Sequence, residues 1–244
     1  MPPTALTPEQ QLASFHTTKA NQVLISAAQG SRFAKEVAGD HNPIHDEDAP
    51  RFCVPGDLLF ALIAARYGLA LDLRIRFNGM LRADTPLHFP LSPGSEFSVL
   101  GDNDKAYVSV TRGTDLSTPL PALWAFIKAY VACSGTTFPG LLQPLLKAKD
   151  VMFNPQRPLV VYDSMRITLT TPPQSHPTIS LQHADLAVTG KRGDVTFNFS
   201  INEQGRRIGE CAKKMVVSGL RPYDSATMMD IIERYESSKK QHRD

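Results

Sequence analysis

The sequence has little cysteine and almost no excess charge of either sign. Its three cysteines, Cys53, Cys133 and Cys211, form no C-x-x-C pair. This pattern excludes a disulfide scaffold and argues against a structural zinc site. The 244 residues include 26 Lys and Arg against 24 Asp and Glu, a formal charge of +2. Bulk charge therefore predicts neither a nucleic-acid nor a membrane partner.

Long hydrophobic runs are also lacking. The most apolar stretches, 58–65 and 120–131, are interrupted at Arg66 and Lys128, and both are shorter than the roughly 18–20 residues that span a bilayer. Residues 1–11 have no cationic region followed by an apolar run, so no secretory signal is expected. Since no glycine-rich nucleotide loop, serine elbow or His-x-Glu zinc pattern occurs either, we expect a cytoplasmic protein without metal or redox cofactor.

A hydrophobic fraction of 42% is ordinary for a folded protein. Residues 1–20 look like a flexible arm. A helix is predicted from Ser26, which forms a capping-box pattern with Gln29, to Gly39. A second helix between Pro55 and Gly68 is apolar on every side, so it must be surrounded by other elements.

Strand patterns follow this enclosed helix. Residues 71–77 alternate between apolar and charged, and 97–100 and 105–111 flank a hairpin turn. The second half repeats the plan, with an apolar helix at 121–131 and four strands within 159–218, before a final amphipathic helix. These elements predict an α+β protein with a flexible arm at 1–20, units at 21–115 and 116–222, and a C-terminal helix and tail at 223–244.

The most informative segment follows the first helix. It carries Asp40, His41, Asn42, Pro43 and His45 in one short loop. Eleven residues later comes Gly56, where the start of the enclosed helix offers an unpaired backbone N–H at its positive end. An acid, an imidazole and oriented N–H groups are the parts needed for proton transfer beside a polarised carbonyl.

The run Gly-Asp-x-Asn-Pro-Ile-His, followed by Val54-Pro55-Gly56 and an apolar helix, resembles the MaoC-like (R)-specific enoyl-CoA hydratases. It is also similar to an uncharacterised bacterial family, which implies no function. The match covers roughly residues 31–68. It implies a hot-dog fold, in which a curved antiparallel sheet wraps a central helix, and here a double hot-dog in one chain.

The resemblance also implies roles for individual residues. Asp40 and His45 match the catalytic dyad, Asn42 matches the asparagine that shapes the loop, and Gly56 matches the glycine whose N–H holds the thioester carbonyl. Water held by the dyad would add across the double bond of a trans-2-enoyl thioester of coenzyme A or acyl carrier protein. No cofactor is implied, and the assembly would be a monomeric pseudo-dimer or a homodimer.

Several nearby residues have other interpretations. Asp57 is expected to be a helix-start residue whose charge would oppose an enolate at Gly56, and the segment from His45 to Gly56 is shorter than in typical hydratases. We count Pro43, His41, Cys53 and Asp57 as candidate substrate contacts, although His41 is expected to face solvent. The basic residues Arg206, Arg207, Lys213 and Lys214 are expected on a solvated face of the sheet.

Three alternatives to a hydratase remain open from the sequence. A non-catalytic acyl-binding or regulatory protein would keep the loop as a fold element. A thioesterase would release free thiol from a saturated acyl-CoA. A structural protein would need no site and would show a closed pocket around Asp40.

Overall fold

The computed structural model describes residues 6–241, and a ten-stranded antiparallel sheet forms its framework. From edge to edge the strands are β1 (Thr17–Lys19), β2 (Gln22–Leu24), β5 (Leu87–His88), β6 (Glu96–Gly101), β7 (Ala106–Arg112), β4 (Asp72–Phe77), β10 (Val160–Leu169), β13 (Arg206–Ser218), β12 (Arg192–Glu203) and β11 (Thr178–Thr189). Two small pairs lie outside this sheet: β3 (Leu69–Ala70) with β8 (Asp115–Leu116), and β9 (Val151–Met152) with β14 (Arg221–Pro222).

Strands from the two halves of the chain meet at one seam in the sheet. β4 pairs with β10, with Leu73 opposite Ile167 and Ile75 opposite Met165. All four of these side chains are buried. The strands predicted from alternation in both halves are confirmed, and they form one continuous sheet. The proposed boundary between units at residue 115 remains a prediction.

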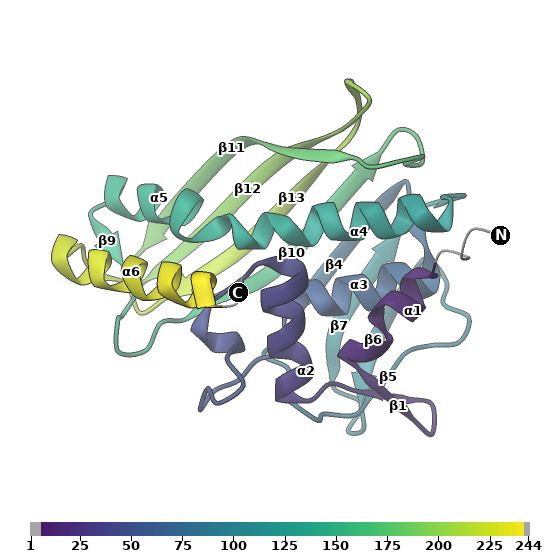
Figure 1. Cartoon of the computed structure of the whole chain (residues 1–244), viewed down its shortest axis with the longest axis horizontal. Helices are drawn as coiled ribbons and strands as arrows, with labels where there is room; N and C mark the ends of the chain where they lie inside the picture. The colour runs from purple at the N-terminus through teal and green to yellow at the C-terminus, as the bar shows by residue number, and fades with distance from the viewer. Residues whose placement is uncertain (1–5, 242–244) are drawn as a thin grey trace.

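Six α-helices accompany the sheet in the described chain: α1 (Pro8–Leu12), α2 (Ala27–Arg32), α3 (Gly56–Tyr67), α4 (Leu120–Gly135), α5 (Leu142–Ala148) and α6 (Ser225–Gln241). A π-helical segment, Phe33–Ala38, continues α2. In Figure 1, α4 lies across the sheet with α3 close to it, while α6 lies near the end of the α2 segment.

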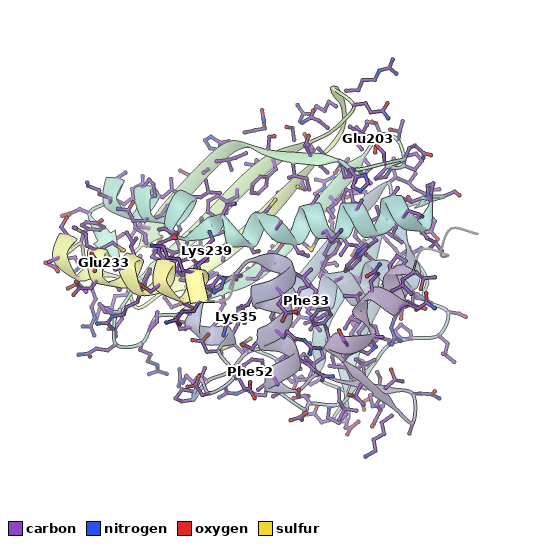
Figure 2. The ribbon with its side chains drawn as sticks, viewed as in Figure 1. Phe33, Lys35, Phe52, Glu203, Glu233 and Lys239 are labelled. Atoms are coloured by element: carbon purple, nitrogen blue, oxygen red, sulfur yellow. The ribbon has the colours of Figure 1, made fainter. Side chains whose placement is uncertain are left out.

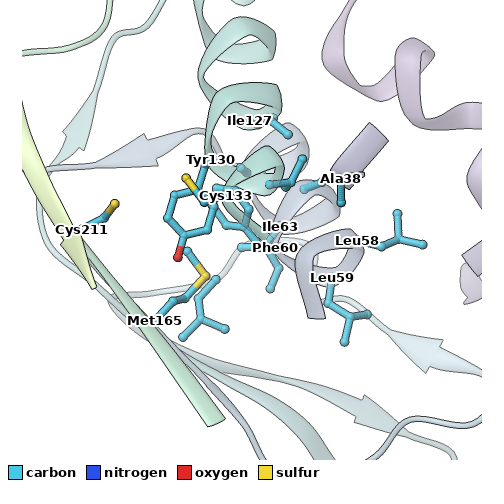
Figure 3. Packing of buried hydrophobic residues seen from close by; sticks show 14 of the residues in the cluster. Ala38, Leu58, Leu59, Phe60, Ile63, Ile127, Tyr130, Cys133, Met165 and Cys211 are labelled. Atoms are coloured by element: carbon cyan, nitrogen blue, oxygen red, sulfur yellow. The ribbon is translucent and has the colours of Figure 1, made fainter. Parts of the chain in front are cut away.

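Helix α3 is enclosed as its composition predicts. Every residue from Asp57 to Ala64 is buried, which an apolar helix without a polar face requires. Phe60 of α3 packs against Tyr130 of α4 with ring centroids 4.7 Å apart. Tyr130 extends from α4 towards Met165 and Cys211 of the sheet (Figure 3). The two apolar helices therefore share one core on the sheet.

The N-terminal region differs from the expected flexible arm. Residues 1–5 lie outside the described residues, but α1 begins at Pro8 with a capping box between Thr7 and Gln10. Leu12 and Phe15 are buried in the core. The prediction of a loose arm over 1–20 is thus wrong for residues 8–20. Burial of these apolar side chains in the core is more favourable in free energy than their exposure to water in a flexible arm.

Candidate functional site

Asp40 is positioned by the end of the helical segment before it. Gly39 has φ 63° and ψ 20°, the left-handed conformation that glycine adopts without steric cost. The chain therefore turns sharply, and the backbone N–H of Asp40 donates to the carbonyl of Ala34 at 2.8 Å. The predicted helix from Ser26 to Gly39 is confirmed, including the capping box between Ser26 and Gln29.

The loop after Asp40 is held by its own side chains. The Asp40 carboxylate accepts a hydrogen bond from the N–H of Asn42 at 2.9 Å, and the Asn42 side-chain oxygen accepts one from the N–H of Ile44 at 3.2 Å. Asn42 thereby begins a short 3₁₀ turn, Pro43–His45. Pro43 has a fixed φ that suits the first position of this turn. The arrangement presents Asp40 and His45 on the same side of the loop.

His45 is oriented by the backbone of Cys53. Its Nδ1 lies 2.7 Å from the Cys53 carbonyl oxygen. A carbonyl only accepts, so Nδ1 carries a proton, and Nε2 faces the Asp40 carboxylate. The distance from Nε2 to Asp40 Oδ2 is 3.8 Å, and the two side chains keep 13% and 21% of their surface exposed. This distance is too long for a direct hydrogen bond and lets one water molecule contact both groups.

Burial changes the proton affinity of Asp40. Removal from water raises the pKa of its carboxyl group above the usual 3.8, while His45 and the N–H of Asn42 act in the opposite direction. Asp57 adds a further upward contribution and Lys213 a downward one. A carboxylate with a raised pKa is a stronger base than an exposed one, as a proton acceptor requires.

A cavity of about 230 Å³ connects the dyad to the start of α3. We call it the dyad cavity; its wall includes Asp40, His45, Gly56, Asp57, Phe77 and Tyr162. Gly56 is the first residue of α3, and no side chain caps the helix there. Its N–H is one of the donors that a helix N-terminus leaves unpaired. The wall of the cavity therefore includes Asp40, His45 and the first residue of α3.

Gly56 lies close to two aromatic rings. A Cβ atom at this position would come 3.0 Å from Cδ1 of Tyr162 and 3.2 Å from Cζ of Phe77. The two rings are themselves in contact, with centroids 4.7 Å apart. Any residue larger than glycine would therefore press on these rings.

Asp57 is buried beside Gly56 and is paired with Lys213 of β13. Lys213 Nζ lies 3.0 Å from Asp57 Oδ1 and 2.8 Å from Ser134 Oγ, while the Ser134 hydroxyl donates to Asp57 Oδ2 at 2.5 Å. The ammonium also lies over the ring of Tyr130, 4.5 Å from its centroid. The negative charge expected to oppose an enolate is therefore compensated, because a cation lies on the same carboxylate.

Two expectations about surface residues are wrong. Lys213 is 2% exposed, not solvated, because in β13 it faces inward between Cys211 and Met215; its neighbour Lys214 is exposed. His41 is 5% exposed, since Tyr235 of α6 covers it with the two ring centroids 5.9 Å apart. The aromatic partner comes from a helix nearly two hundred residues later, which no local pattern indicates.

The remaining candidate residues lie around the two cavities of this region. Cys53 lines the dyad cavity, and burial raises the pKa of its thiol to about 11. A thiol with this pKa stays protonated and is a poor nucleophile. Pro43 and His41 line a neighbouring cavity beneath α6. In residues 6–241, no group of three His, Cys, Asp or Glu side chains is placed to hold a metal ion.

Much of the site comes from the second half and was not predicted. Ser134, Tyr162 and Met215 all line the dyad cavity. One signal was available for Lys213: strand alternation places it on the apolar face with Cys211, Met215 and Val217. A lysine on a buried face requires an acidic partner, and Asp57 was the charged residue at the start of the enclosed helix.

The sheet and its buried helices define a hot-dog protein of the α+β class, as expected, with a polar site at the start of α3. The chain belongs to the family described as "Protein of unknown function (DUF3581)", whose model matches residues 10–226. No curated protein matches the sequence. Among the described residues, no helix is both long and apolar enough to cross a membrane.

Several solved structures are similar to this chain. One is a conserved protein with a hot-dog fold from Alicyclobacillus acidocaldarius, with 10% identity, a TM-score of 0.45, and coverage of 88% of this chain and 98% of that one. Another is an acyl-CoA thioesterase II from Mycobacterium marinum, with 12% identity, a TM-score of 0.42, and coverage of 90% and 99%. A MaoC-like dehydratase has 9% identity, a TM-score of 0.42, and coverage of 86% and 99%. At these identities and scores, none of them indicates a reaction for this chain.

Proposed function

We propose that this protein is a MaoC-like hydratase or dehydratase that acts on a trans-2-enoyl thioester of coenzyme A or acyl carrier protein. One observation carries the proposal. The Asp40 carboxylate and the Nε2 atom of His45 lie 3.8 Å apart on the wall of a cavity that also contains the start of α3 at Gly56.

The proposed reaction begins with the thioester carbonyl accepting a hydrogen bond from the Gly56 N–H. Water held between Asp40 and His45 attacks the β-carbon, so a C–O bond forms as the C=C electron pair moves towards the carbonyl oxygen. Asp40 takes a proton from the water, and His45, protonated on both ring nitrogens in this step, gives its Nε2 proton to the α-carbon. The proton held by Asp40 then returns to Nε2, which restores both groups. The enolate oxygen is stabilised by the Gly56 N–H and the positive end of α3. The compensation of Asp57 by Lys213 supports this, since it limits repulsion of the enolate.

Crotonyl-CoA provides the direct assay, with loss of the enoyl absorbance as the readout. We expect the unsubstituted protein to hydrate it and the His45→Ala protein to lose most of the activity. Activity that survives unchanged in both His45→Ala and Asp40→Asn would exclude the mechanism. Binding of an acyl-CoA without turnover would instead favour a non-catalytic acyl-binding protein.

A thioesterase is the second candidate, and the position of Asp57 favours it. Its carboxylate and the Ser134 hydroxyl both line the dyad cavity, where a carboxylate can activate water for attack on a carbonyl. The pairing with Lys213 weakens this role, because an ion-paired carboxylate is a poorer base. Release of free thiol from a saturated acyl-CoA separates the two reactions, because a hydratase leaves the thioester bond intact.

A further inference from the structure

A second cavity, of about 290 Å³, lies beneath α6 next to the dyad cavity. We call it the α6 chamber; its apolar wall includes Phe138, Leu142, Phe153, Pro158, Ile231 and Tyr235. Figure 2 labels Glu233 and Lys239 on the same helix, α6. These apolar residues come from α6 and from the chain between α4 and β10, while the loop that carries Asp40 forms another part of the wall.

The two cavities adjoin each other at Asp40. Five residues line both of them: Asp40, Asn42, Ser134, Val160 and Met215. Tyr235, on the chamber side, approaches the same loop, since its hydroxyl lies 3.3 Å from the backbone N of His41. A molecule whose reacting carbons lie beside Asp40 in the dyad cavity can thus extend past this carboxylate into the chamber.

We propose that the α6 chamber binds the apolar tail of the substrate's acyl chain and makes the protein selective for enoyl thioesters of about twelve to fourteen carbons. This inference rests on the proposed hydratase function. With the carbonyl at Gly56 and the double bond at the dyad, the carrier lies on the dyad-cavity side and the tail lies beyond Asp40. The aliphatic and aromatic wall of the chamber suits a hydrocarbon tail, because burial removes apolar surface from water on both sides.

The size of the chamber sets the chain length. A cavity of about 150 Å³ holds one benzene molecule, so 290 Å³ accommodates about ten carbon atoms. Each methylene transferred from water into such a site strengthens binding about fourfold. The first three carbons of the acyl chain lie in the dyad cavity, so a crotonyl group places only its methyl carbon towards the chamber. Chains of about twelve to fourteen carbons fill it.

The test compares trans-2-enoyl-CoA substrates of increasing length in three proteins. We expect kcat/KM in the unsubstituted protein to rise from four carbons to about twelve to fourteen and then to fall. Ile231→Trp fills the chamber and should reduce the ratio of decenoyl-CoA to crotonyl-CoA activity at least tenfold. Met229→Trp is the matched control: Met229 lies on the same helix and is 60% exposed, so this variant should keep the original length profile.

A length profile that is flat in the unsubstituted protein, or the same in the Ile231→Trp protein, would overturn the chamber assignment and leave the hydratase proposal intact. Ile231→Ala provides a second variant in case the tryptophan prevents folding. It enlarges the chamber, so the optimum should move to longer chains, and an unmoved optimum counts against the assignment.

A binding measurement separates the inference from the proposed reaction. Decanoyl-CoA is saturated and cannot be hydrated, so calorimetry reports its binding even if the protein hydrates no enoyl-CoA at all. Absence of all hydration would refute the proposed function alone. Decanoyl-CoA affinity that falls at least tenfold in Ile231→Trp but not in Met229→Trp supports the chamber, and equal affinity in all three proteins refutes it.

Discussion

The Asp40 carboxyl group determines how the proposed site responds to pH. Burial raises the pKa of this group. The nearby His45 and the Asn42 N–H lower it, but by less than burial raises it. A raised pKa means that the group still holds its proton at pH values where an exposed aspartate is ionised. Because Asp40 must be ionised to accept a proton from water, the site should be inactive when this carboxyl group is protonated.

We therefore predict that kcat/KM falls on the acidic side with an apparent pKa above the ordinary aspartate value of 3.8. The fall occurs as pH decreases through this pKa, since protonation removes the base. Rates for crotonyl-CoA across a pH series measure it, with thermal unfolding followed at each pH to separate loss of structure. An acidic limb that persists unchanged in Asp40→Asn would assign the titration to a different group.

Among the secondary-structure elements, the helical segment before the site fixes the position of Asp40. Gly39 ends this segment in the left-handed conformation, and Asp40 follows directly. Gly190, in the turn between β11 and β12, also has a positive φ, 57°, and its missing Cβ would meet open space. The two glycines thus share the same backbone requirement, and only Gly39 adjoins the dyad.

Gly39→Ala and Gly190→Ala should each cost roughly 1–2 kcal/mol of folding free energy, because an L-residue is strained in this conformation. Urea unfolding measures this loss. Hydratase activity should fall only in Gly39→Ala, since relaxation of the strain there displaces the Asp40 carboxylate. Equal activity in the two variants would show that the helix end does not position the dyad.

A helix or strand is predictable from the sequence when the pattern that specifies it lies among neighbouring residues. The capping box at Ser26 and the alternation of 71–77 arise from neighbouring residues, and both predictions are confirmed. Thr7 and Gln10 form the same type of capping box at the start of α1. This local signal contradicts the prediction of a loose arm for residues 8–20. Burial of His41 depends on Tyr235, a contact that forms only when α6 packs on the loop. Long-range packing of this kind leaves no periodic trace in the sequence.

At the scale of the whole molecule, a buried charge network joins the two halves. Asp57 lies at the start of α3, Ser134 near the end of α4, and Lys213 in β13. The ion pair is enclosed, with both side chains at most 6% exposed. Such a pair adds little stability compared with apolar residues, but loss of one partner leaves a buried charge without compensation.

Lys213→Ala should therefore reduce the free energy of unfolding by about 3–5 kcal/mol. Lys214→Ala is the matched control, because this adjacent lysine points to the opposite face and is exposed; we expect a change within about 0.5 kcal/mol. Urea unfolding of both variants gives the comparison. Similar stabilities would mean that the Asp57 carboxylate finds another partner or stays protonated without Lys213.

The sequence predicts only part of the site, because the rest is assembled by contacts between distant segments of the chain. Its first-half portion, with Asp40, Asn42, His45 and Gly56, lies in one continuous motif, and these residues surround or adjoin the dyad cavity. The opposite wall is formed by strands and helices of the second half, which carries no motif. Their contribution depends on the seam between β4 and β10, which brings Tyr162 and Met215 near α3.

In the proposed mechanism, Asp40 acts as the base that activates water. The most direct measurement is kcat/KM for hydration of a trans-2-enoyl-CoA by Asp40→Asn and by Asp48→Asn, an exposed aspartate of the same loop. We expect a loss of about 10²–10⁴-fold for Asp40→Asn and no loss for Asp48→Asn. Equal hydration by Asp40→Asn and the unsubstituted protein would contradict it.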